Sequence, residues 1–152
     1  MRRNRLLWIW LPSQWSTALT RGTTRAHLAR AALEAIAYQT VDAVEAMEAA
    51  SGARLAELRV DGGGTANAWL MQFQADVLGR SVVVPEVPET TGLGAAYLAG
   101  VGAGVWSLEQ CSSIWREAVR YEPRMSEDER RLLLEQWRRA VERSREWARP
   151  AV

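Results

Sequence analysis

A run of three glycines between a short apolar segment and a helix constrains this sequence more than any other feature. Leu58 and Val60 lead into Asp61, the glycines at 62–64 follow, and apolar residues at helical spacing begin directly after them. A fully apolar run of strand type, Val82–Val84, comes about one helix length later. This alternation of strand and helix predicts an α/β fold.

The glycine run has a physical use. A backbone without Cβ atoms can approach a ligand closely, and the N-terminus of the following helix offers free N–H groups and the positive end of its dipole. The pattern is not a P-loop, because no Gly-Lys-Ser/Thr follows, and it is not the dinucleotide fingerprint, because the glycines are contiguous. Two interpretations remain open: a nucleotide-binding turn, and a plain tight turn between strand and helix.

Polar residues flank the glycines on both sides. Asn67 can cap the following helix, and its amide can also bond a base or a ribose. Asp61 can orient the loop, form a structural Asx turn, or contact a ribose hydroxyl or a metal. The residues alone do not choose between these roles.

Hydrophobic spacing and capping residues predict the other elements. A long Ala-rich helix over residues 25–50 begins at Thr23 or Thr24 and ends at Gly52. The helix after the glycines ends at Gly79. Later elements are a loop over 89–94, with Thr90 and Thr91 as capping residues, and helices over 95–101, 107–119 and 126–147, the last with Ser126 and Glu129 as a capping box. The expected total is about two strands and four to five helices.

Composition excludes several classes of function for this chain. Nineteen basic residues, all of them arginine, face eighteen acidic ones, so the net charge of +1 calls for neither a nucleic acid nor a membrane partner. The absence of lysine removes Schiff-base and phosphate-loop lysines. A single cysteine, Cys111, and a single histidine, His27, exclude a disulfide framework, a zinc site and a Cys–His pair. We therefore expect no metal site built from these residues.

The first eighteen residues differ from the rest. They begin MRRNRLLWIWLPSQW, a Trp/Arg-rich segment with an apolar run too short for a secretory signal or a membrane span. Three interpretations remain open: a non-native leader, an interfacial anchor, and a buried apolar strand. We expect a leader at 1–18 and a separate structural unit at 19–152.

Three strings together carry a family resemblance. HLARAALEAIAYQTVDAVEAM, LRVDGGGTANAWLMQFQADVLG and VPEVPETTGLGAAYLAGVGAGVW occur in the order and spacing of the C-terminal part of the glycerol kinases. These enzymes are FGGY carbohydrate kinases within the actin-like ATPase superfamily. The resemblance implies a helix-rich part of the C-terminal domain of that ribonuclease H-like fold.

Functional expectations follow from the resemblance. It implies an ATP- and Mg²⁺-dependent kinase that acts on glycerol, in a cytoplasmic family whose intact members are homo-oligomers. It places the adenosine contacts on Gly62, Gly63 and Asn67, whereas the family often has Ala and Val at Gly64 and Thr65. His27 lies in a second family signature, where we interpret it as structural.

The resemblance stops abruptly near Ala18. The front half of the second signature requires glycines, but residues 14–19 read QWSTAL. The family places its general base, its polyol site and its phosphate loops earlier, so we expect no catalytic residue here. Because phosphoryl transfer depends on groups around the γ-phosphate, we expect a truncated kinase that is inactive alone. The alternatives are one half of a split kinase, and a non-catalytic interaction module that uses the leader.

Overall fold

A computed structural model describes residues 20–144 of the chain. The elements are α1 (Arg25–Ser51), β1 (Glu57–Arg59), the 3₁₀ turn η1 (Gly63–Ala66), α2 (Ala68–Leu78), β2 (Ser81–Pro85), α3 (Thr90–Gly102), α4 (Leu108–Ile114), β3 (Glu117–Tyr121) and α5 (Glu127–Ser144). The predicted helix-rich α/β fold is confirmed. The expectations for residues 1–18 and for the end of the last helix at 147 lie outside the described residues.

One three-stranded sheet, in the order β1-β2-β3, forms the centre of the described chain. β1 pairs parallel with β2, with Leu58 opposite Val82. β3 pairs antiparallel with the other edge of β2, with Val82 opposite Tyr121 and an irregularity at Val84/Pro85. The parallel pair is joined through α2, which gives a β-α-β unit.

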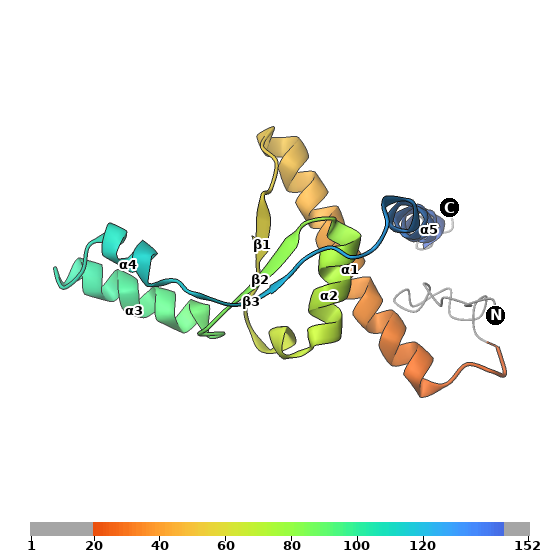
Figure 1. Cartoon of the computed structure of the whole chain (residues 1–152), viewed down its shortest axis with the longest axis horizontal. Coiled ribbons are helices and arrows are strands. Elements are labelled where there is room, and N and C mark those ends of the chain that lie inside the picture. The colour runs from red at the N-terminus through yellow and green to blue at the C-terminus, as the bar shows by residue number, and fades with distance from the viewer. Residues whose placement is uncertain (1–19, 145–152) are drawn as a thin grey trace, which may run out of the picture.

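The core centres on α2, which packs against α1, α5 and the sheet (Figure 1). Tyr38 of α1 is fully buried at its centre. Its ring stacks on that of Trp137 in α5, with the ring centroids 5.4 Å apart, and packs edge-on against that of Phe73 in α2, with the centroids 5.6 Å apart. These three aromatic rings join the three helices, so helices far apart in the sequence pack on one another.

The boundaries of α1 agree with the sequence prediction. Thr24 is its N-cap, and the backbone N–H of Thr24 donates to Nδ1 of His27 at 3.1 Å. The helix ends at Gly52, which adopts the left-handed conformation at φ 69°. His27 therefore helps to cap a helix, in agreement with the structural interpretation.

Two segments differ from the prediction. The helix expected over 107–119 ends at Ile114, and β3 begins at Glu117. The third strand forms because β2 offers it a free edge, a long-range pairing that helical spacing does not reveal. The loop expected over 89–94 is also wrong, because α3 begins at Thr90. Glycine in a helix costs only about 1 kcal/mol relative to alanine, so Gly92 and Gly94 weaken this helix without preventing it.

An arm made of residues 86–116, which we call the α3–α4 arm, points away from the core (Figure 1). α3 contains no charged residue, yet none of its residues is buried. The rings of Tyr97 in α3 and Trp106 pack edge-on within the arm, with their centroids 5.7 Å apart. Within residues 20–144, no helix is both long and apolar enough to cross a bilayer.

Candidate functional site

The glycine turn lies at the carboxyl end of β1 and leads into α2. The last ladder bond runs from the N–H of Val60 to the carbonyl of Val83 at 3.0 Å. Gly62 then adopts φ 81° and ψ 179°, a conformation that is essentially restricted to glycine. In α/β sheets, ligands bind outside the carboxyl ends of the strands, which is the position of this turn.

The turn is open on its side-chain side. A Cβ atom built on Gly62, Gly63 or Gly64 would meet no atom within 4 Å. The hydroxyl of Thr65 donates to the carbonyl of Gly62 at 2.8 Å, and its N–H donates to the same oxygen at 3.1 Å. These two bonds fix the backbone of the turn, and the open space beside the glycines lets a ligand approach that backbone closely.

Asn67 lies between the turn and α2. Its Oδ1 accepts from the N–H of Leu70 at 3.1 Å, so the predicted capping role is confirmed. Its own N–H donates to the carbonyl of Gly64 at 3.1 Å. One short segment therefore places Gly62, Gly63 and the Asn67 amide around the start of α2.

Asp61 is held by the α3–α4 arm. Its Oδ2 accepts from the hydroxyl of Thr90, the first residue of α3. Beside this bond, the N–H of Gly62 donates to the carbonyl of Pro88 at 3.0 Å. The geometry favours the loop-orienting role for Asp61. The sequence predicts a capping role for Thr90 but does not reveal this hydrogen bond, because the two partners are 29 positions apart.

Charged residues on the sheet pair with one another instead of lining the turn. Arg120 donates to Glu57 at 2.8 Å and to Glu117 at 2.6 Å, while Arg59 donates to Glu57 at 3.0 Å. The hydrogen bonds from Arg120 and then Arg59 lower the pKa of Glu57. The guanidinium of Arg59 also lies 4.0 Å above the ring of Trp115. This network joins β1 to β3 across β2.

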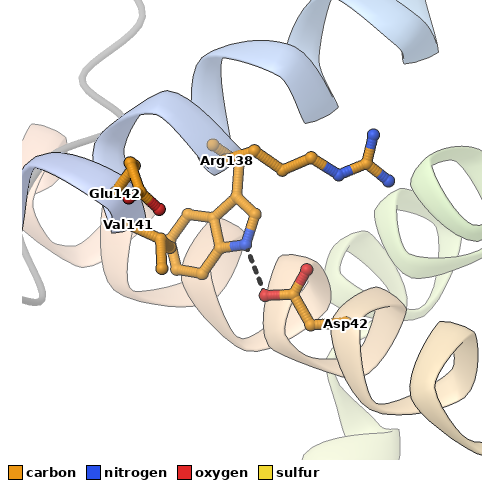
Figure 2. A pocket seen from close by; sticks show the side chains of 5 residues that line it. Asp42, Arg138, Val141 and Glu142 are labelled. Carbon is orange, nitrogen blue, oxygen red and sulfur yellow. Dashed lines mark hydrogen bonds between the residues drawn. The ribbon is translucent and has the colours of Figure 1, made fainter. Parts of the chain in front are cut away.

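A concave region with a volume of about 290 Å³ lies between α1 and α5 (Figure 2). The indole Nε1 of Trp137 donates to Oδ2 of Asp42 at 2.7 Å. Arg138 extends from α5 and forms an ion pair with Glu45 of α1 at 2.7 Å. These bonds connect the two helices, so we assign the region to helix packing.

Among the described residues, no group of three or more His, Cys, Asp or Glu side chains could hold a metal ion. The carboxylate nearest the turn, Asp61, is bonded to Thr90. These residues therefore do not form a metal cage of their own.

Comparison with known proteins identifies the family to which this fold belongs. A family model described as the C-terminal domain of the FGGY family of carbohydrate kinases matches residues 8–103, and the chain belongs to this family. Its curated relatives include the glycerol kinase of Aromatoleum aromaticum, 62% identical over 130 residues, and that of Dechloromonas aromatica, 60% identical over 131 residues. The matches cover 85% and 86% of this chain but 26% of each relative, so the chain spans about a quarter of their length.

Solved structures confirm the fold. Plasmodium falciparum glycerol kinase, described as a complex with ADP, matches with a TM-score of 0.72 and 36% identity over 84% of this chain and 26% of its own. Xylulose kinase from Rhodospirillum rubrum matches with a TM-score of 0.68 and 26% identity over the same shares. The resemblance stated from the sequence is thereby confirmed.

Proposed function

We propose that residues 19–152 form part of the nucleotide-binding domain of a glycerol kinase and hold the adenosine side of ATP. The nucleoside approaches the backbone of Gly62 and Gly63 closely, and Asn67 offers its side-chain amide at the start of α2. The observation that carries this proposal is the open turn, where a Cβ on each glycine would meet nothing within 4 Å.

The proposed reaction transfers the γ-phosphate of ATP to glycerol and gives glycerol 3-phosphate. Such a transfer depends on positioning and on charge stabilisation around the γ-phosphate. This chain's part is to bind and orient the nucleoside end. The general base and the phosphate contacts come from the other three quarters of a kinase of this family, whether in the same polypeptide or in a second chain. We place this activity in the cytoplasm, in a homo-oligomer.

Mg²⁺ would accompany the phosphates of the nucleotide. It usually keeps several waters and takes one or two carboxylates plus substrate phosphates. The described residues contain no group of three or more His, Cys, Asp or Glu side chains that could hold the ion. We therefore assign the metal no ligand in this chain.

Nucleotide titration monitored by amide chemical shifts tests the proposed site. ADP and adenosine should both shift the amide signals of Gly62, Gly63 and Asn67, whereas inorganic phosphate should not. The amides of Gly52 and Gly79, which end α1 and α2 far from the turn, serve as internal controls. A folded chain whose turn amides do not respond to millimolar ADP would refute the adenosine assignment.

A coupled assay of ATP consumption tests the reaction. The 152-residue chain alone should show no glycerol-dependent turnover. Co-expression with the remaining three quarters of a related glycerol kinase, as a separate chain, should restore turnover if the two parts assemble. Glycerol-dependent activity of the isolated chain would contradict the division of roles proposed here.

A further inference from the structure

The glycine turn has two hydrogen bonds to the α3–α4 arm, and the function described so far uses neither. The hydroxyl of Thr90 donates to Asp61, directly before the glycines. The N–H of Gly62 donates to the carbonyl of Pro88, two residues before the first residue of α3. Both bonds join the start of the turn to the start of one helix.

We propose that Thr90 and Asp61 are positioning residues of the nucleotide site, which hold the glycine turn in its open form through the first turn of α3. The inference rests on the proposed function for its ligand, a nucleoside diphosphate or triphosphate. Neither side chain needs to touch the nucleotide. They act through the backbone of Gly62.

The turn needs such a tie because of its composition. Glycine loses more conformational freedom on folding than any other residue, and three glycines stand in succession here. The C-terminal side of the turn is braced by the two bonds from Thr65 to the carbonyl of Gly62. The N-terminal side is braced by Asp61 and by the N–H of Gly62. Both of these braces end on residues 88–90.

Two substitutions of Thr90 separate the hydroxyl from the shape of the side chain. Thr90→Val keeps the branched shape and removes the donor, whereas Thr90→Ser keeps the donor. Because a hydrogen bond contributes net stability equivalent to about a 3- to 10-fold change in an equilibrium constant, Thr90→Val should speed exchange of the Gly62 amide with solvent by that factor. It should weaken ADP binding by a similar factor, and Thr90→Ser should restore both within about twofold.

The two readouts keep the inference separate from the proposed function. Hydrogen exchange of the Gly62 amide is measured without nucleotide and does not depend on ADP binding. If the unmodified chain does not bind ADP, the proposed nucleotide site is refuted and the positioning role is still tested. Unchanged Gly62 exchange in Thr90→Val would refute the positioning role alone. Exchange of the Ala75 amide within α2 shows whether the core is intact. Should Thr90→Val fail to fold, Asp61→Ala removes the same bond from the other side, and the same measurements decide.

Discussion

The three glycines of the turn should respond differently to the same substitution by alanine. Gly62 lies at φ 81° and ψ 179°, so Gly62→Ala should destabilise the fold by about 1–3 kcal/mol through backbone strain. Gly63 and Gly64 have no positive φ, and a Cβ on either meets open space. Alanine at these two positions should therefore be neutral or stabilising by about 0.4–1 kcal/mol, because it restricts the unfolded chain.

Nucleotide affinity should follow a different order from stability. The Cβ of Gly63→Ala enters the space through which the adenosine approaches, so ADP binding should weaken about tenfold, or about 1.4 kcal/mol. Gly64→Ala is the matched control, since it adds the same atom one residue further along, at a position with no assigned contact. Its affinity should stay within about twofold of the unmodified chain.

Two measurements on each variant decide the matter. Urea unfolding followed by circular dichroism gives the stability order, and isothermal titration with ADP gives the affinity order. Equal ADP affinity in Gly63→Ala and the unmodified chain would refute the contact assigned to Gly63. An unchanged unfolding midpoint in Gly62→Ala would refute the strain argument.

Three further predictions concern the supporting structure. Trp137→Ala should cost about 3–5 kcal/mol in urea unfolding, because this buried ring stacks on Tyr38; a loss below about 1 kcal/mol would contradict the central role of the three rings. The pKa of Glu48 is lowered, mainly by the hydrogen bond that its carboxylate accepts from the backbone N–H of Leu55. Its carboxylate therefore stabilises the fold above its ordinary pKa of 4.5 and loses this effect as the pH falls further; Glu48→Gln should flatten the fall of the unfolding midpoint between pH 5 and 3, and an unchanged slope would exclude this contribution. A Cβ on Gly100 would overlap the ring of Trp106, so Gly100→Ala should speed limited proteolysis of the α3–α4 arm; Gly102→Ala, whose Cβ would meet nothing within 4 Å, should not.

The sequence predicts correctly those helices whose ends are set by neighbouring residues. α1 is marked by Thr24 before it and Gly52 after it, and both act as expected. Asn67 caps α2 for the same reason, since its amide reaches a backbone N–H three residues ahead. Such signals need only a few neighbouring residues, so they survive without knowledge of the tertiary fold.

Elements whose causes are distant were missed. β3 exists because Val119 and Tyr121 pair with the edge of β2, and its short sequence lies directly after a helix. The bond between Asp61 and Thr90 joins residues 29 positions apart. Neither leaves a periodic pattern in the sequence. The same applies to the stack of Tyr38 on Trp137, which brings the first helix against the last.

The distinction between local and distant causes also separates the two halves of the proposed chemistry. Recognition of the nucleoside end rests on a turn whose glycines, Thr65 brace and Asn67 cap lie within six consecutive residues, 62–67. The tie from residues 88–90 that holds this turn also lies within the chain. Transfer of the γ-phosphate instead requires groups on both sides of the reacting atoms, held to a fraction of an ångström. Those groups cannot be supplied by a single turn and helix N-terminus. We therefore expect adenosine binding to persist in this chain by itself, and phosphoryl transfer to appear only when the other three quarters of a kinase of this family supply the groups around the γ-phosphate.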